Sequence, residues 1–131
     1  MNRFILSAVL LVVMVCHATS QSLTPQQSTV TIQYMEGDTA ILPCSLSREG
    51  RYSLVWADHW FTVLTFNAYC LVDDQRISVV RSHLGEWNLK IENVTRADQG
   101  LYTCQTSTTP ISSQSVMLYV VLREDNPSVL I

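Results

Sequence analysis

Short stretches in which hydrophobic and polar residues alternate recur along the chain between Thr29 and Val121. A period of two residues is typical of β-strands that bury one face, and turn-forming residues such as Glu36-Gly-Asp38 separate the stretches. The pattern predicts an all-β protein. The nine expected strands are 29–33, 39–45, 54–56, 63–66, 68–72, 76–80, 87–91, 101–106 and 115–121.

Two cysteines, a tryptophan and a tyrosine indicate the kind of β protein. Cys44 lies 60 residues before Cys104 and 12 before Trp56, and Tyr102 lies two residues before Cys104. Side chains two apart on a strand share a face, and Gly100 permits the tight turn into that strand. This order is that of an immunoglobulin-like β-sandwich, in which a disulfide joins the cysteines, the tryptophan packs on it, and the tyrosine hydroxyl bonds to upstream backbone.

Two segments after the tryptophan strand indicate the subtype. Residues 63–66 and 68–72 fit the C′ and C″ strands, which variable-type sandwiches possess and constant-type sandwiches lack. We therefore predict a variable-type domain, with an intermediate set that has a reduced C″ strand as the alternative. In variable-type sandwiches the positions of Arg76 and Asp98 meet, and we expect them to form a structural ion pair.

The first 20 residues have the features of a secretory signal peptide. Arg3 supplies a basic start, residues 4–16 are apolar, and Ala18-Thr19-Ser20 offers a small-residue cleavage site; an uncleaved signal anchor is the alternative. We expect secretion, or display at the cell surface if the chain is a fragment of a longer protein. The predicted organisation is a signal peptide at 1–20, a flexible lead-in at 21–28, an immunoglobulin-like domain at 29–122, and a linker or truncated tail at 123–131.

Charge and cysteine content limit the possible partners. The chain has 8 basic and 11 acidic residues, for a formal net charge of -3, and the basic residues do not cluster. We therefore expect neither nucleic acid nor an anionic membrane surface to bind.

Cys16 is removed with the signal peptide, which leaves Cys70 outside the predicted disulfide. It is either a free thiol or the site of an intermolecular disulfide.

The residues present do not predict catalysis or a bound cofactor. His59 and His83 lie in separate predicted loops, whereas a metal site needs several clustered donors. Asp73-Asp74 is a weak calcium signal that is more typical of a solvated turn. Nucleophile-elbow and phosphate-loop motifs are absent from the sequence. We expect no enzyme activity, cofactor, metal or small-molecule substrate.

Asn93-Val-Thr95 is an N-glycosylation sequon, and Asn93 is predicted to carry a glycan.

Four segments resemble the first domain of the lachesin, Dpr, DIP and IgLON group of neuronal adhesion proteins. They are Val63-Leu-Thr-Phe66, Asp74-Gln-Arg-Ile-Ser-Val79, Trp87-Asn-Leu-Lys-Ile91 and Cys104-Gln-Thr-Ser-Thr-Thr-Pro110. The resemblance implies binding to another immunoglobulin domain, homophilic or heterophilic, through the C–C′–C″–F–G face of the sheet. Members of that group usually carry two or three such domains and a membrane anchor. Antigen-receptor variable domains are disfavoured, because residues 111–115 lack their glycine-containing bulge.

We predict the partner-binding face from the direction of side chains on the expected strands. Positions that alternate with Trp56 and Cys104 point outward, and they are small or uncharged, as is common at the centre of interfaces. Strand C′ contributes Val63 or its neighbour Leu64. The full prediction is Val55, Ala57, Val63, Leu64, Phe66, Tyr69, Thr103 and Gln105.

Four aromatic residues gather near the C′ and C″ segments: Trp60, Phe61, Phe66 and Tyr69. Aromatic side chains are favoured anchors at interfaces, although we expect one or two of the four to cover the core. Two other functions are alternatives: a secreted immune-type or antagonist protein that binds through its loops, and a structural matrix spacer.

Overall fold

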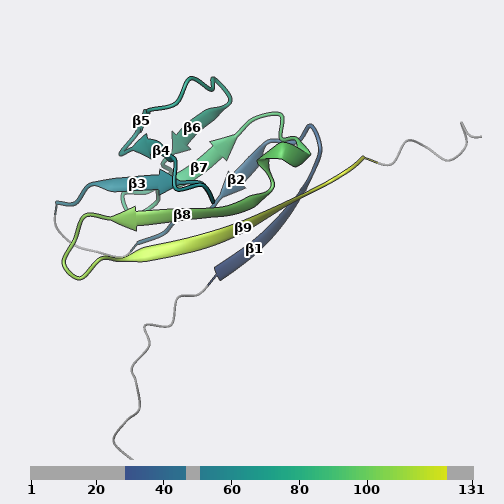
Figure 1. Ribbon diagram of the computed structural model, residues 1–131. Helices are drawn as coiled ribbons and strands as arrows, with labels where there is room; N and C mark the ends of the chain where they lie inside the picture. The colour runs from purple at the N-terminus through teal and green to yellow at the C-terminus, as the bar shows by residue number, and fades with distance from the viewer. Residues whose placement is uncertain (1–28, 47–50, 124–131) are drawn as a thin grey trace, which may run out of the picture.

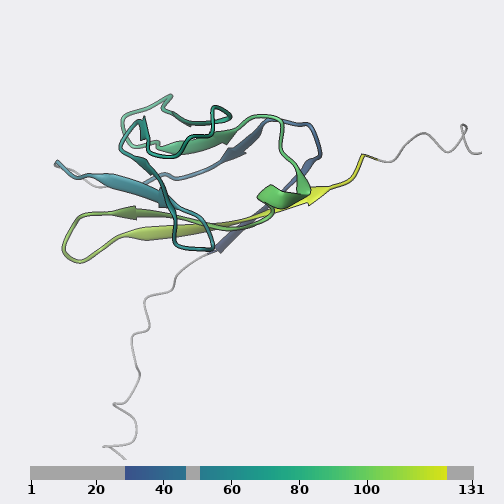
Figure 2. The ribbon, with the colours of Figure 1, turned by 45° about the horizontal axis from the view of Figure 1, so that its top comes forward.

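Two β-sheets packed face to face form the body of the protein in the computed structural model, which describes residues 29–46 and 51–123 (Figures 1 and 2). The larger sheet has the strand order β1-β9-β8-β3-β4-β5, and the smaller has β2-β7-β6. The strands are β1 Thr29–Met35, β2 Ala40–Leu42, β3 Leu54–Ala57, β4 Val63–Phe66, β5 Tyr69–Cys70, β6 Ile77–Val80, β7 Asn88–Ile91, β8 Gly100–Thr106 and β9 Ser113–Val121.

The predicted variable-type sandwich is confirmed. Strands β3, β4, β5, β8 and β9 take the places of C, C′, C″, F and G, and β1 extends the same sheet by pairing in parallel with β9. The predicted signal peptide, the lead-in and most of the tail lie outside the described residues. Within the described residues, no helix is long and apolar enough to cross a membrane.

Two strands are shorter than the hydrophobic pattern predicts. The expected strand 39–45 is regular only over Ala40–Leu42, because Pro43 has no backbone N–H to donate to the ladder. The Cys44 N–H instead donates to the side-chain Oδ1 of Asn88 at 3.0 Å. The expected strand 68–72 is reduced to Tyr69–Cys70 at the edge of the sheet.

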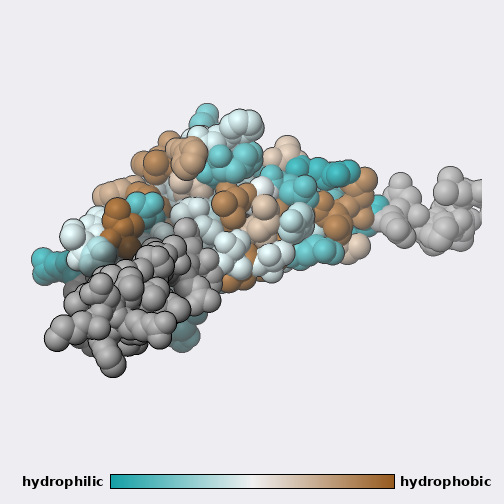
Figure 3. Space-filling view, turned by 60° about the horizontal axis from the view of Figure 1, so that its bottom comes forward, coloured by the Kyte–Doolittle hydropathy of each residue, from teal (hydrophilic) through white to brown (hydrophobic). Residues whose placement is uncertain are grey.

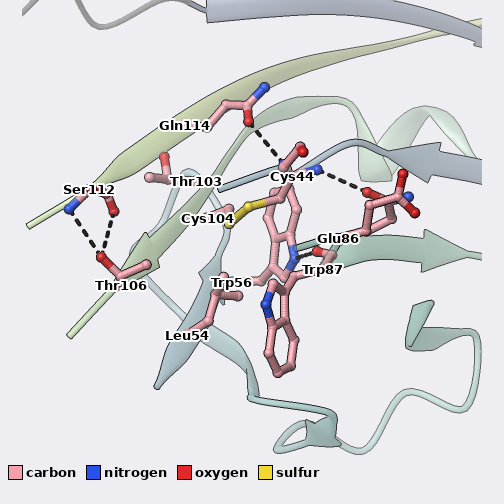
Figure 4. Close-up of a disulfide and its surroundings, with 12 residues drawn as sticks. Cys44, Leu54, Trp56, Glu86, Trp87, Thr103, Cys104, Thr106, Ser112 and Gln114 are labelled. Atoms are coloured by element: carbon pink, nitrogen blue, oxygen red, sulfur yellow. Dashed lines mark hydrogen bonds between the residues drawn. A yellow bond between two sulfur atoms is a disulfide. The ribbon is translucent and has the colours of Figure 1, made fainter. Parts of the chain in front are cut away.

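The core between the sheets is built around the predicted disulfide between Cys44 and Cys104, which the structure contains (Figure 4). Trp56 is fully buried in this core, and its indole Nε1 donates to the backbone oxygen of Trp87 at 2.7 Å. The cross-link joins residues 60 apart in sequence and should contribute about 2–5 kcal/mol, chiefly by restricting the unfolded chain. It fixes the two sheets to each other.

Candidate protein-interaction face

The outward side of the six-stranded sheet carries no formal charge. The strand pairings bring together side chains that point away from the core, and we call this set the uncharged face. Its members are Thr29, Thr31, Gln33, Met35, Val55, Ala57, Val63, Phe66, Tyr69, Leu101, Thr103, Gln105, Ser113, Ser115, Met117, Tyr119 and Val121. Figure 3, which brings the underside of Figure 1 forward, shows hydrophobic residues in several separate patches. Uncharged groups cost less to desolvate than ions, which suits this face for contact with another protein.

The strand register places most of the predicted binding residues side by side. Val55 pairs with Gln105, and Ala57 pairs with Thr103, across β3 and β8. On the other side of β3, Ala57 pairs with Val63. Phe66 pairs with Val55 and then with Tyr69, so the row continues to the edge strand β5.

The prediction that Leu64 belongs to this face is wrong. The register between β3 and β4 shifts between Trp56 and Ala57, so that Trp56 pairs with Thr65 while Ala57 pairs with Val63. Leu64 is the extra residue in this bulge, and both Leu64 and Thr65 are buried. A bulge changes which neighbouring residues point outward. Val63 is therefore the residue exposed on the face, at 41%.

Asp58 forms several hydrogen bonds within the loop between β3 and β4. Its carboxylate Oδ1 accepts hydrogen bonds from the backbone N–H groups of Trp60 and Thr62, each at 2.9 Å, and its carbonyl accepts one from Phe61 N–H at 3.0 Å. Aspartate commonly organises turns in this way. The sequence analysis did not identify this role, although an aspartate directly after a strand was the available signal.

His59, in the same loop, packs against Gly100 at the start of β8. A Cβ built on Gly100 would lie 2.6 Å from His59 Nδ1, closer than real atoms approach, so the imidazole occupies the space that the glycine leaves. The backbone φ of Gly100 is +153°. Gly100 therefore allows a close approach between the loop and the sheet, in addition to the turn expected of it.

All four aromatic residues near β4 and β5 are exposed, so the expectation that one or two would cover the core is wrong. Trp60 is 77% exposed, Phe61 90%, Phe66 43% and Tyr69 73%. The reason lies in the loop geometry, because the Asp58 hydrogen bonds turn Trp60 and Phe61 away from the protein. Phe66 faces outward through its pairing with Val55.

A hollow of about 170 Å³ opens on the uncharged face next to this loop. It is lined by Val55, Ala57, Asp58, His59, Phe61, Leu101, Thr103 and Gln105. Four of the predicted binding residues, Val55, Ala57, Thr103 and Gln105, therefore line one depression. Asp58, His59 and Phe61 complete its wall from the loop, so the loop places one carboxylate at the edge of the uncharged face.

Charged side chains gather instead at one end of the sandwich, where β6 begins and the short 3-10 helix η1 (Arg96–Asp98) lies. We call this the lower end of the sandwich, whatever its place in the figures. Arg76 Nη1 is 2.8 Å from Asp98 Oδ2, Arg76 Nη2 is 3.0 Å from Asp98 Oδ1, and Nη2 is 2.9 Å from Asp74 Oδ2. Arg76 and Asp98 thus form a two-pronged ion pair. Asp74 joins it, a role that the sequence analysis did not predict.

This network shifts the pKa values of its members. Hydrogen bonds to Asp98 and then Asp74 raise the pKa of Arg76. Burial pushes the pKa of Asp98 upward, but bonds from Arg76 and the Thr95 backbone outweigh it and leave that pKa below its usual value. The pKa of Asp74 is lowered chiefly by its hydrogen bond from Arg76. All three groups therefore favour their charged forms in the folded protein.

Tyr102 connects this network to the core. Its hydroxyl donates to the backbone oxygen of Asp98 at 2.6 Å, as in the tyrosine corner of immunoglobulin sandwiches. Burial, followed by the negative charge of Asp98, raises the pKa of Tyr102.

Comparison with known proteins agrees with this geometry. The family model of the immunoglobulin V-set domain matches residues 26–121. The chain belongs to the immunoglobulin V-set family. The nine strands found among the described residues, the disulfide and the tyrosine corner follow the expected pattern for variable-type sandwiches.

Relatives of this V-set domain include adhesion proteins. Cell adhesion molecule 2 of rat, mouse and human is 32% identical over 110 residues, which cover 84% of this chain and 25% of the relative. The chain thus spans about a quarter of the length of the curated relatives it matches.

Two solved structures extend the comparison. A structure of DIP-gamma IG1+IG2 has a TM-score of 0.67 and 31% identity, and the match covers 74% of this chain and 47% of that one. The Ig1 domain of mouse SynCAM 2 has a TM-score of 0.65 and 31% identity, and the match covers 73% of this chain and 93% of that one. The resemblance to first domains of adhesion proteins is confirmed.

The remaining candidate residues of the V-set domain lie apart from the hollow. Cys70 is exposed and carries no disulfide; its Sγ lies 3.3 Å from the backbone oxygen of Val72. Asn93 is exposed on the turn between β7 and η1. Among the described residues, no group of three or more histidine, cysteine or acidic side chains is placed to hold a metal ion.

Proposed function

We propose that this V-set domain is an extracellular recognition module that binds another immunoglobulin domain through the uncharged face. The observation that carries the proposal is the lack of formal charge across that face, while charged side chains occupy the lower end and the smaller sheet. Charged residues are depleted at the centres of protein interfaces. Exposed aromatic residues such as Phe66 and Tyr69 supply contact area beside the hollow.

The comparisons support an immunoglobulin partner. A chain in the structure of Dpr11 IG1 bound to DIP-gamma IG+IG2 is 30% identical to this chain with a TM-score of 0.66. A chain in the structure of Dpr1 IG1 bound to DIP-eta IG1 is 29% identical with a TM-score of 0.63. Both complexes join immunoglobulin domains. We assign the same class of partner to this chain, and a role in cell adhesion.

An extracellular location and a glycan complete the proposal. Residues 1–20 direct the chain to the secretory pathway, where the disulfide forms in an oxidising environment. A glycan on Asn93 lies at the lower end, near Arg76, whose Nη1 is 3.2 Å from the Asn93 backbone oxygen. Because Asn93 is not part of the uncharged face, a sugar there leaves that face open to a partner.

A binding screen tests the proposal. Secreted, disulfide-bonded protein is immobilised and exposed to first domains of cell-adhesion immunoglobulin proteins and to itself, with unrelated β-sandwich domains as controls. Ala57→Asp places a charge in the hollow and is expected to abolish binding. Ser78→Asp, on an exposed position of β6 in the other sheet, is the matched control and should bind normally. Binding to no immunoglobulin domain, or equal effects of both substitutions, would contradict the proposal.

A further inference from the structure

A second depression, larger than the hollow, opens at the lower end between the two sheets. Its volume is about 290 Å³, and we call it the end pocket. Its floor is apolar, because Leu64 of the larger sheet and Ile77 and Ile91 of the smaller sheet line it together with Val72. A floor of this kind favours a ligand with an aliphatic portion, since burial of that portion removes apolar surface from water.

The end pocket is also acidic. Four carboxylates line it, those of Asp58, Asp73, Asp74 and Asp98. Arg76 pairs with Asp74 and Asp98, but no ion pair among the described residues includes Asp58 or Asp73. The hydrogen bonds to the Asp58 carboxylate come from uncharged backbone N–H groups. The pocket therefore holds more negative than positive charge, and it attracts a cation.

The negative charge extends to the inner wall of the end pocket. Tyr102 lines this wall. Burial raises the pKa of its hydroxyl first, and the negative charges of Asp98 and Asp58 raise that pKa further. Carboxylates from two separate segments of the chain, the β3–β4 loop and η1, thus act on the same space.

Trp60 adds an aromatic surface to the end pocket. Its indole lines the pocket and is 77% exposed. The ring centroid lies 4.9 Å from that of His59, and His59 in turn packs against Gly100. Among aromatic side chains, tryptophan attracts cations to its ring face most strongly, so Trp60 and the carboxylates favour the same class of ligand.

These features fit an arginine side chain better than a metal ion. Among the residues that the structure describes, no group of three or more histidine, cysteine or acidic side chains is placed to hold a metal ion. An arginine side chain buries its aliphatic stem on apolar surface while its charged head stays near water. Its planar guanidinium pairs with carboxylates and stacks on aromatic rings. The floor, the carboxylates and the indole each match one part of this side chain.

We propose that the end pocket binds an arginine side chain of a partner protein. The stem lies on the apolar floor, and the guanidinium lies against Trp60 and the carboxylates of Asp58 and Asp73. This inference goes beyond the proposed function and does not depend on it, because the end pocket is a different depression from the hollow. Asp58 and His59 border both depressions, so the β3–β4 loop lies between the two sites.

NMR spectroscopy of the secreted, disulfide-bonded chain with 15N-labelled tryptophan tests the inference. The chain has three tryptophans, and Trp60→Ala identifies the indole N–H signal of Trp60. The probe is Nα-acetyl-L-arginine amide, whose main chain is uncharged as in a protein. It should shift the Trp60 signal with a dissociation constant of about 1–10 mM, as for a weak contact, and leave the signal of the buried Trp56 in place. The citrulline counterpart, which has nearly the same shape without the charge, should bind at least about fivefold more weakly.

Paired substitutions locate the contacts of the guanidinium. Asp58→Asn combined with Asp73→Asn removes two negative charges, while the asparagine oxygen at position 58 still accepts the hydrogen bonds of the loop. This double variant should raise the dissociation constant of the arginine probe at least about fivefold. Glu86→Gln is the matched control, because Glu86 lies before β7, whose other end lines the pocket through Ile91; it should change the constant less than about twofold. Thermal melts verify that each variant is folded.

The outcomes decide the inference without involving the uncharged face. Equal binding of the arginine and citrulline probes overturns it, as do equal effects of the double variant and Glu86→Gln. A Trp60 signal that does not move at about 50 mM arginine probe, well above the expected dissociation constant, also overturns it. None of these results changes the standing of the proposed function, which the binding screen and Ala57→Asp test separately.

Discussion

The outward sides of the two sheets obey the same alternation but differ in chemistry. On the smaller sheet, the outward row holds Lys90 between Ile41 and Ser78, and Lys90 Nζ forms an ion pair of 3.2 Å with Glu92 Oε1. The uncharged face of the larger sheet has no such residue, although it also lies on the surface. The alternation of hydrophobic and polar residues is enough to form both sheets. It does not require that one outward side carry charged residues and the other carry none. The contrast is the basis for our proposal that the uncharged face, and not the outward side of the smaller sheet, binds a partner.

Charge is absent from the uncharged face but contributes to structure elsewhere. Arg76 joins β6 to η1 through Asp98, and Asp74 holds the arginine from the turn before β6. These groups connect segments at the lower end without entering the uncharged face. If the uncharged face is the recognition surface, as we propose, then substitutions at the charged network should affect stability and substitutions on the uncharged face should affect binding.

Asp98→Ala should have the largest effect, and the effect should be on stability. It leaves Arg76 without its closest partner and removes the bond from Thr95 N–H to Asp98 Oδ2 at 2.8 Å. We expect a loss of about 2–4 kcal/mol in the free energy of unfolding, less than for a fully buried pair, because the Arg76 side chain is 32% exposed. Chemical denaturation measures the loss. A variant as stable as the wild type would show that the ion pair does not stabilise the fold. Binding to an immunoglobulin partner should be unchanged under conditions where the variant is folded.

A pair of identical substitutions maps the extent of the binding region within the uncharged face. Gln105→Glu, in the hollow, should weaken binding to an immunoglobulin partner at least about 10-fold, because the added charge must be desolvated. Gln33→Glu makes the same chemical change on β1, at the opposite edge of the sheet from β5, and should alter affinity less than about threefold. Titration by biolayer interferometry or calorimetry gives both values. Equal losses would extend the interface across β9 and β1.

Acid should weaken the lower end while leaving the uncharged face chemically unchanged. The folded-state pKa values of Asp98 and Asp74 lie below their unfolded values, so their contribution to stability is fully present above about pH 4. It is lost as the pH falls through the folded-state values, because over this range the unfolded chain binds protons more readily than the folded protein does. Denaturation curves across this range should show a smaller acid-dependent loss for Asp98→Asn than for the wild type. Parallel curves for the two proteins would refute the assignment.

Removal of a glycan from Asn93 should have the smallest effect. Secreted protein from a glycosylating host should lose mass on treatment with an N-glycosidase, and Asn93→Gln should abolish the difference. Affinity for an immunoglobulin partner should change less than about threefold, because Asn93 lies outside the uncharged face. A large change in affinity would move the binding region toward the lower end.

The sequence by itself determined the β-sandwich, its disulfide and the residues packed around that disulfide. Alternation located the strands, and the spacing of Cys44, Trp56, Tyr102 and Cys104 identified the disulfide and the residues packed around it. These features depend on the local period of hydrophobic residues and on a few positions where the fold accepts few residue types. They can therefore be predicted from the sequence. The outward direction of Val55, Ala57, Thr103 and Gln105 follows from the same alternation.

The tertiary structure alone decided which residues of the loop and of β4 reach the surface. A one-residue bulge buries Leu64 and exposes Val63, and register of this kind is set by pairing with a distant strand rather than by the segment itself. Hydrogen bonds to Asp58 turn Phe61 outward, and the space above Gly100 receives His59. The hollow is formed by residues of β3, β8 and the loop between β3 and β4, which come together only when the sheet has assembled.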